Sequence, residues 1–211
     1  RDWTTLGSIQ LDLKQTDEAK TSLLRAVELW WRLMRSDPEV LSALEPLAGL
    51  YRDTADYAKA EPLYALALRI RETAFGPDSA ELLGALDSLA YVYFGQRKFA
   101  EAEPIYQRLL SLWEITAGPE HPMVALTLDK LVTFYVEQNR FEEASTLADR
   151  AVELRARALI TSYRSRARVA AGNNEGQAAV DLITKADKVR ELAGIARPSQ
   201  TVLPAPKDAQ V

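Results

Sequence analysis

Two stretches of sequence decide the fold: residues 57–77 read YAKAEPLYALALRIRETAFGP, and residues 99–119 read FAEAEPIYQRLLSLWEITAGP. Both carry the pairs Glu-Pro and Gly-Pro at the same places, and their tyrosine, leucine and glutamate residues also align at a spacing of 42 residues. The glycine of each Gly-Pro pair suits the left-handed conformation beyond a helix end, and the proline cannot continue a helix. Each stretch therefore predicts one helix with a defined stop.

The same register extends over residues 44–152. Four kinds of position recur in it three times. They are Leu47, Leu89 and Leu131; Tyr51, Tyr93 and Tyr135; Tyr57, Phe99 and Phe141; and Ala60, Ala102 and Ala144. A further, weaker copy begins at Trp3. Self-similarity on this scale means that one supersecondary unit is repeated and stacked. Such units bury their apolar faces against neighbours and leave a long curved surface for partners, so the pattern predicts a binding protein.

Each unit is predicted to be a pair of helices. Apolar side chains between residues 44 and 51 recur at intervals of three, four and seven, which is one face of a helix. The polar residues 53–56 interrupt this pattern, and we expect the Asp56 carboxylate to accept from free amides at the start of the next helix. The apolar pattern resumes at Tyr57 and should end at Gly76.

This pattern resembles the tetratricopeptide repeat. The 42-residue period and the phrases Ala-Glu-Pro-Leu-Tyr and Gly-Pro-Glu-His-Pro are similar to the longer, kinesin-light-chain type of that repeat. The resemblance implies an all-α fold, a right-handed α-solenoid of stacked antiparallel helix pairs whose concave groove binds peptides or proteins. Repeats are expected over about residues 3–36, 38–76, 80–118 and 122–158.

The C-terminal part fits the repeat less well. Residues 159–194 are predicted to form a degenerate repeat or a capping helix pair, with a turn at Gly172-Asn173-Asn174. Terminal units need a polar outer face, which makes their sequences atypical. Residues 195–211 contain three prolines in a polar stretch and predict an extended tail.

Composition narrows the class of protein. The net charge of −4 argues against a mainly nucleic-acid-binding role. No apolar run approaches the roughly 18 residues that span a membrane. Absence of cysteine fits the cytoplasm and the periplasm equally well, and no signal peptide is visible, so the cytoplasm is favoured. The chain begins at Arg1 rather than Met, which leaves open a removed N-terminal segment and with it the periplasm.

No catalytic or cofactor motif is found. The chain has no cysteine and one histidine, His121, which cannot supply the usual zinc ligand sets. His121 lies in the repeated Gly-Pro turn, which favours a structural role. There is no glycine-rich phosphate loop and no Gly-x-Ser-x-Gly. We expect no enzyme, no metal and no cofactor.

The resemblance also points to the residues of the groove. The family's groove position is occupied here by Glu45, Asp87 and Asp129. A carboxylate accepts hydrogen bonds and cannot donate them, so a column of three favours a partner with basic or amide-rich segments. The alternative is a solvated acidic face that pairs with nearby arginine or lysine.

Other groove-side positions include Arg52, Tyr91, Phe94, Thr133 and Val136. Tyr91 and Phe94 are three residues apart and share a helix face. They are predicted to form an anchor pocket for a partner side chain, because aromatic residues often dominate interfaces. The alternative is that they pack against the adjacent second helix.

A second interface is predicted outside the groove. Adjacent helix positions lie about 100° apart, so Trp30 and Trp31 cannot both face one core. An exposed tryptophan there would mark an interface. A run of arginines without acidic residues places three of them on one helix face: Arg157, Arg164 and Arg168. The first interpretation is a solvated face. The second is a contact with another protein or another copy of the chain, and the third is a nucleic-acid contact.

The function that follows is a non-catalytic scaffold or adaptor that binds a peptide or protein in its groove. The alternative is an accessory structural subunit of a larger assembly, anchored by the tail and by the Trp30-Trp31 and arginine surfaces.

Overall fold

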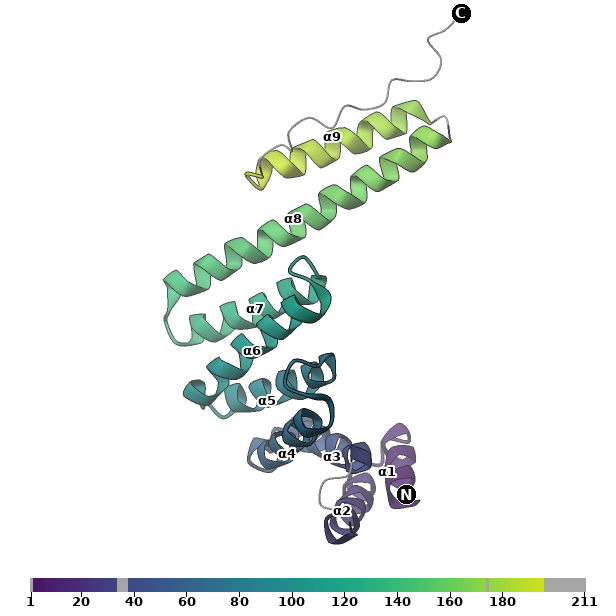
Figure 1. Cartoon of the computed structure of the whole chain (residues 1–211), viewed down its shortest axis with the longest axis vertical. Coiled ribbons are helices and arrows are strands. Elements are labelled where there is room, and N and C mark those ends of the chain that lie inside the picture. The colour runs from purple at the N-terminus through teal and green to yellow at the C-terminus, as the bar shows by residue number, and fades with distance from the viewer. Residues whose placement is uncertain (1, 34–37, 174, 196–211) are drawn as a thin grey trace, which may run out of the picture.

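The computed structural model describes residues 2–33, 38–173 and 175–195. Within these residues there are nine α-helices and no strands, which confirms the all-α class. The helices stack in chain order into a right-handed α-solenoid, with α1 at one end and α9 at the other (Figure 1). None of the described helices has both the length and the apolar composition needed to cross a membrane.

Successive helices form antiparallel pairs, and two short 3-10 helices precede the second and third pairs. The bounds are α1 (Asp2–Asp12), α2 (Thr16–Leu33), η1 (Pro38–Val40), α3 (Leu41–Asp53), α4 (Tyr57–Phe75), η2 (Ala80–Leu82), α5 (Leu83–Gly95), α6 (Phe99–Ala117), α7 (Pro122–Glu137), α8 (Phe141–Gly172) and α9 (Gly176–Leu192). The helices begin and end close to the positions that the repeat pattern predicts, as far as the end of α7.

One turn geometry joins the two helices of each of the first four pairs. The same place in each turn has a positive φ, between 57° and 61°. The following residue donates its N–H to the carbonyl five residues earlier, at 2.8–2.9 Å, as in the Schellman closure of a helix end. The cap predicted for Asp56 is wrong: its carboxylate caps no amide and instead accepts from Lys59 at 2.6 Å.

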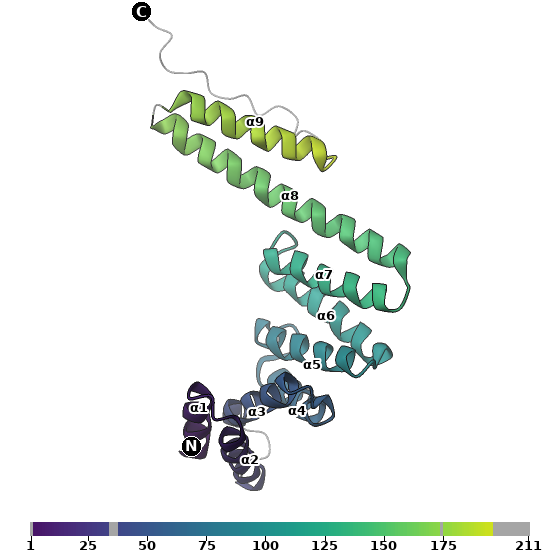
Figure 2. The ribbon, with the colours of Figure 1, turned by 180° about the vertical axis from the view of Figure 1, so that it is seen from behind.

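The ends of the second helices explain the one large departure from the repeat. Gly76 and Gly118 end α4 and α6 with φ of 85° and 93°. At the corresponding position in α8 the chain has Ile160 and Thr161, and residues 141–171 contain neither glycine nor proline. The helix therefore continues for 32 residues, and the predicted boundary between residues 158 and 159 falls inside it (Figure 2).

Helix α9 packs against the C-terminal half of α8, and we call this hairpin, residues 159–195, the arm. Its buried contacts are mostly alanine, at positions 167, 170, 179 and 186. The extended tail predicted over residues 195–211 lies, apart from Ile195, outside the described residues. So do the side chains of Trp30 and Trp31, although both residues belong to α2.

Candidate interaction groove

A cavity of about 770 Å³ opens along the first helices of three successive repeats. Five of the eight predicted groove residues line it, and they come from α3, α5 and α7. The lining consists of Arg52, Asp53, Ala55, Tyr57, Asp87, Ser88, Tyr91, Phe94, Tyr106, Lys130 and Thr133. Val136 is 45% exposed and lines neither this cavity nor the one beside it.

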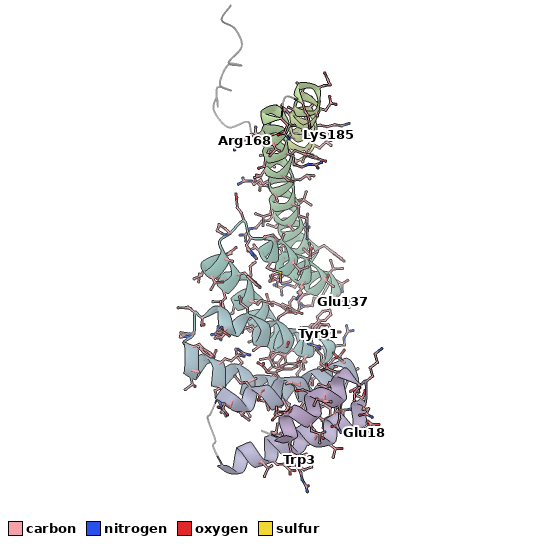
Figure 3. The ribbon with its side chains drawn as sticks, turned by 90° about the vertical axis from the view of Figure 1, so that its right-hand side faces the viewer. Trp3, Glu18, Tyr91, Glu137, Arg168 and Lys185 are labelled. Carbon is pink, nitrogen blue, oxygen red and sulfur yellow. The ribbon has the colours of Figure 1, made fainter. Side chains whose placement is uncertain are left out.

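The apolar part of this cavity is aromatic. Tyr91 is 49% exposed, and its ring meets Tyr57 edge-on with 6.1 Å between centroids. Figure 3 shows Tyr91 projecting from the same edge of the stack as Glu137. Phe94 is half-buried, and its ring centroid lies 6.0 Å from that of Phe99 and 6.2 Å from that of Phe134. Tyr91 therefore faces the cavity, whereas Phe94 belongs both to the cavity wall and to the core.

Tyr106 of α6 adds a polar atom at the floor of the cavity. The residue is only 4% exposed, yet it lines the opening. No hydrogen bond to its hydroxyl is found in the part of the chain that the structure describes. Burial raises the pKa of this phenol, and the nearby Asp87 carboxylate and Tyr91 raise it further. The hydroxyl is therefore protonated at neutral pH and free to donate a hydrogen bond to a bound group.

The three predicted groove carboxylates are all paired with basic residues of the protein. Each pair joins a first helix to the next helix or repeat. Arg71 donates to both oxygens of Glu45, at 2.7 and 2.8 Å. The other pairs are Asp87 with Lys130 and Asp129 with Arg155. The column of carboxylates is therefore largely neutralised within the protein.

A second cavity, of about 690 Å³, adjoins the first and shares Arg52, Asp53 and Ser88 with it. Glu45 and Arg71 lie in this second cavity. The shared residues make the two cavities one continuous groove, which runs from the end of α1 to α7. Because Arg52 and Asp53 pair with each other at 2.8 Å, the boundary between the cavities is also close to neutral.

The predicted second interface divides into two parts in the structure. Arg157 pairs with Glu153 at 2.6 Å and with Glu120 at 3.3 Å, so its charge is compensated. Arg164 and Arg168 make no ion pair within the described residues, and Figure 3 shows Arg168 near the far end of the arm.

His121 has a structural position. It is the N-cap of α7, where its Nδ1 accepts from the backbone N–H of Met123 at 3.3 Å. Its ring stacks on Trp113, with 5.4 Å between centroids and 7° between planes. These contacts use one ring nitrogen and one face of the imidazole, and they fix the turn that begins the fourth repeat.

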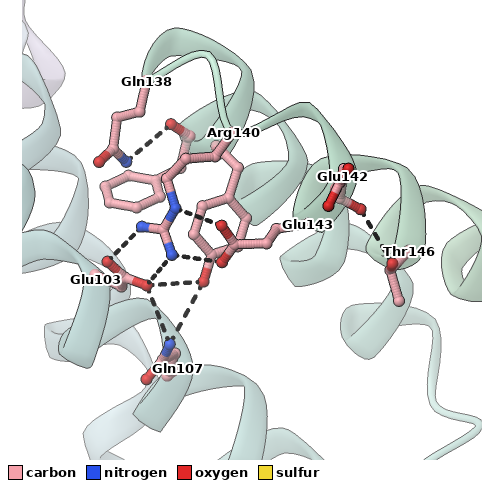
Figure 4. A network of polar contacts seen from close by, with 9 residues as sticks. Glu103, Gln107, Gln138, Arg140, Glu142, Glu143 and Thr146 are labelled. Atoms are coloured by element: carbon pink, nitrogen blue, oxygen red, sulfur yellow. Dashed lines mark hydrogen bonds and ion pairs between the residues drawn. The ribbon is translucent and has the colours of Figure 1, made fainter.

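A polar network between the start of α6 and the turn from α7 to α8 joins the third and fourth repeats (Figure 4). Glu103 accepts from Arg140 through both oxygens, at 2.8 and 3.0 Å, and from the Tyr135 hydroxyl at 3.0 Å. Arg140 also lies over the Tyr135 ring, 4.3 Å from its centroid. The hydrogen bond from Arg140, followed by that from Tyr135, holds the pKa of Glu103 below its ordinary value of 4.5.

The lowered pKa predicts a pH dependence of stability. Because the folded carboxyl has the lower pKa, the contribution of Glu103 is fully present above pH 4.5 and is lost as pH falls through the folded value. We expect Glu103→Gln to be less stable than wild type by about 2–4 °C in Tm at neutral pH. That difference should shrink between about pH 5 and about pH 3. Thermal unfolding across this range measures it, and a difference that does not change with pH would contradict the assignment.

Comparisons with known proteins agree with the architecture. Sequence profiles of the tetratricopeptide repeat match residues 3–29, 40–81 and 78–157. No curated protein gives a match. Among solved structures, BtubC (BKLC) from P. vanneervenii is 21% identical, with a TM-score of 0.61 over 95% of this chain and 85% of that one.

Two other solved structures have the same fold. A Podosopora anserina protein described as a putative kinesin light chain with nearly identical TPR-like repeats is 21% identical; the TM-score is 0.64 over 91% of this chain and 95% of that one. MamA from Desulfovibrio magneticus RS-1 is 17% identical, with a TM-score of 0.53; the match covers 90% of this chain and 94% of that one. With tetratricopeptide-repeat profiles matched along most of a helical solenoid, the chain belongs to the tetratricopeptide-repeat family, and its fold is similar to that of the putative kinesin light chain.

Proposed function

We propose that the protein is a non-catalytic scaffold that binds a segment of a protein partner along the groove of α3, α5 and α7. The tetratricopeptide-repeat fold supports protein–protein interaction in general. The observation that carries the specific proposal is the aromatic cavity: four rings, from Tyr57, Tyr91, Phe94 and Tyr106, converge on one opening. Its volume of about 770 Å³ lies within the range of small-ligand sites and holds a large side chain with part of its backbone.

The chemistry of the groove favours an apolar anchor in the partner. The rings provide area for such a side chain, and the Tyr106 hydroxyl provides a donor for a backbone carbonyl. A basic segment would have to compete with Arg71, Lys130 and Arg155 for the groove carboxylates. We therefore give the apolar side chain the main role, and a basic or amide-rich flank a secondary one, in which the paired carboxylates accept additional hydrogen bonds.

The test begins with peptides selected from a random displayed library on the immobilised wild-type protein. For the best peptide, Tyr91→Glu should weaken binding by about tenfold or more, because it puts a charge at the centre of the anchor pocket. Ile115→Glu is the matched control: Ile115 is 67% exposed on α6 and lies outside both groove cavities. Fluorescence anisotropy measures the affinities. Equal binding to wild type and to Tyr91→Glu, or failure to select any peptide, would contradict the proposal.

An accessory structural subunit is the second candidate function. The feature that favours it is the arm, where Arg164 and Arg168 have no ion-pair partner among the described residues. A partner held there would be retained by the Tyr91→Glu variant and lost on reversal of both arginines, which separates this candidate from groove binding.

A further inference from the structure

Helix α8 joins two units of the repeat without the loop that separates such units earlier in the chain. The residues that close the turns of the second, third and fourth helix pairs follow one another at intervals of 42, whereas Arg140 and Glu175 are only 35 apart. Glu175 donates its N–H to the carbonyl five residues earlier, as the other turn-closing residues do. Residues 141–158 therefore form the second helix of the fourth repeat, and residues 159–172 form the first helix of a fifth repeat, paired with α9. We call them the second-helix half and the first-helix half of α8.

The second-helix half lacks the cover that other second helices receive from the next repeat. Its Phe141 and Val152 are 60% and 59% exposed. The residues at the same two positions of α4 and α6 are buried or half-buried: Tyr57 and Phe99 in register with Phe141, and Leu68 and Leu110 in register with Val152. Helix α9 lies beside the other end of α8 and leaves this half open (Figures 1 and 2).

The first-helix half is open in the complementary way. Its Leu159 and Val169 are 43% and 64% exposed. The corresponding residues of the second, third and fourth repeats are at most 9% exposed: Val40, Leu82 and Val124 in register with Leu159, and Leu50, Val92 and Phe134 in register with Val169. In those repeats the first helix packs against the preceding second helix. Both open faces lie inside the chain, between α7 and α9, and both are open because α8 continues where earlier repeats reverse direction.

The contact between α6 and α7 shows how two such faces match. Phe99 of α6 meets Phe134 of α7 edge-on, with 5.8 Å between ring centroids. Leu110 of α6 packs against a buried cluster that includes Val124 of α7. The residues in register with these four are the four exposed large apolar residues of α8, so its two halves are complementary surfaces.

The two open faces form one stripe along the whole of α8. The stripe comprises residues 141, 145, 148, 152, 155, 159, 162, 166 and 169, and all of them except Ala148 are exposed. Their spacing alternates between four and three, which is typical of a helix that packs lengthwise against another helix. Since α8 has 32 residues, it presents this stripe over about 48 Å.

The free charges of the two halves have opposite signs. In the second-helix half, Glu142 and Asp149 make no ion pair within the described residues. In the first-helix half, which has no acidic residue, the same is true of Arg164, Arg166 and Arg168. The halves are thus complementary in charge as well as in apolar register, which favours an arrangement that places each half against the other.

We propose that the stripe is a docking surface for a second copy of this chain, with the two α8 helices packed antiparallel about a two-fold axis. The second-helix half of each copy meets the first-helix half of the other, as α6 meets α7. Phe141 then contacts Val169 of the second copy, and Val152 contacts Leu159 of the second copy. Because the contact is two-fold, each pair forms twice and the product is a closed dimer.

The missing loop favours a second copy over a chain that folds back on itself. Seven residues separate the end of α4 from the start of α5, and seven are missing between Arg140 and Glu175 relative to the 42-residue repeat. Reversal within one copy therefore requires part of α8 to unwind and to lose backbone hydrogen bonds. Two intact α8 helices bring the same faces together without that loss.

Polar residues on the stripe limit the strength of the contact. Arg166 occupies the position at which the earlier first helices carry Leu47, Leu89 and Leu131, all at most 3% exposed. The dimer is therefore reversible, and dilute protein is monomeric. Unfolding measured on dilute protein reports on the single copy, in which the side chains of the stripe are exposed.

Disulfide crosslinking tests the arrangement, because the chain contains no cysteine. The double variant Phe141→Cys/Val169→Cys should form covalent dimers on oxidation with copper phenanthroline, and peptide mapping should show residue 141 linked to residue 169. Within one straight helix these positions are about 42 Å apart, so they cannot be bridged there. Phe141→Cys/Ile115→Cys is the control and should stay largely reduced, since Ile115 is exposed on α6. A 141–169 disulfide within one copy, a 141–141 link, or no crosslink above the control would overturn the proposal.

Light scattering tests the association without added cysteines. The mass of wild type should rise with concentration from one copy to two and no further. Val152→Glu should weaken this association by about tenfold or more, because it places a charge at two symmetric points of the stripe. Val180→Glu is the matched control: it makes the same change at a residue of α9 that is 56% exposed and lies off the stripe.

The outcomes separate dimerisation from groove binding. Circular dichroism should show both glutamate variants folded as wild type is, because both side chains are exposed. A wild type that stays monomeric at all concentrations, or equal association of Val152→Glu and Val180→Glu, would contradict the proposal. Tyr91→Glu should dimerise as wild type does, so the result for the groove stands independently of the result for the stripe.

Discussion

Replacing Phe134 with alanine should lower the free energy of unfolding by about 3–5 kcal/mol, the largest loss of stability that we expect from a single substitution. Phe134 is 0% exposed and lies at the junction of the third and fourth repeats. Its ring centroid lies between 5.4 and 6.2 Å from those of four other aromatic residues, which come from α5, α6 and α7: Phe94, Phe99, Tyr106 and Tyr135. Truncation removes these contacts and leaves a cavity that rings fixed on three helices cannot fill.

Urea unfolding followed by circular dichroism measures this effect. Phe141→Ala is the matched control, because it makes the same chemical change at the first residue of α8, where the side chain is 60% exposed. The control should change stability by less than about 1 kcal/mol. Because a solenoid is held by contacts between neighbouring repeats, Phe134→Ala should also broaden the transition as the C-terminal helices unfold first. Similar midpoints for the two variants would contradict the central role of Phe134.

Local signals in the sequence predict most of the fold. The Gly-Pro pairs at residues 76–77 and 118–119 fix the ends of α4 and α6. In each pair the glycine takes a positive φ and the following proline cannot continue the helix, so the signal does not depend on distant residues. The extension of α8 is harder to predict, since its signal is the absence of a stop at Ile160 and Thr161. The repeat pattern alone predicts a helix end near residue 160, although no glycine or proline there would end the helix.

The groove is predicted less completely than the fold. Tyr91 and Phe94 could be identified because they replace smaller or charged residues of neighbouring repeats on a known helix face. Tyr57 and Tyr106 were missed as cavity residues, because they occupy repeated positions that sequence reasoning assigns to the core. Both residues could be recognised in the sequence as repeated positions. That their side chains reach the groove depends on how adjacent repeats stack, which the sequence does not show.

The pairing of the groove carboxylates could be foreseen only as an alternative. Glu45 and Arg71 are 26 residues apart, and Asp87 and Lys130 are 43 apart. The sequence contains many basic residues at such separations, and only the stacking of helices selects the partners. Whether these carboxylates also bind a partner stays a prediction.

The second large effect should come from Gly95→Ala, which we expect to weaken binding of a selected peptide by about tenfold and to cost about 1–3 kcal/mol of stability. Alanine normally stabilises a helix relative to glycine by about 0.5–1 kcal/mol. At Gly95, however, a Cβ would lie 2.6 and 2.7 Å from ring atoms of Tyr57, so the ring must move. Tyr57 both lines the cavity and meets Tyr91 edge-on, and its displacement therefore changes the anchor pocket.

The register explains why this glycine belongs to the site. Asp53 and Glu137 occupy the same position in neighbouring repeats, so the repeat itself does not require glycine there. Gly172→Ala is the matched control: Gly172 is the last residue of α8, as Gly95 is of α5, it lines neither groove cavity, and a Cβ there meets nothing within 4 Å, so this variant should be neutral or more stable. Urea unfolding and peptide anisotropy on both variants measure the two effects. If Gly95→Ala binds as tightly as Gly172→Ala, the close packing of Tyr57 on Gly95 does not shape the pocket, since both variants add a methyl group at a helix end and only the one at Gly95 meets a ring of the cavity.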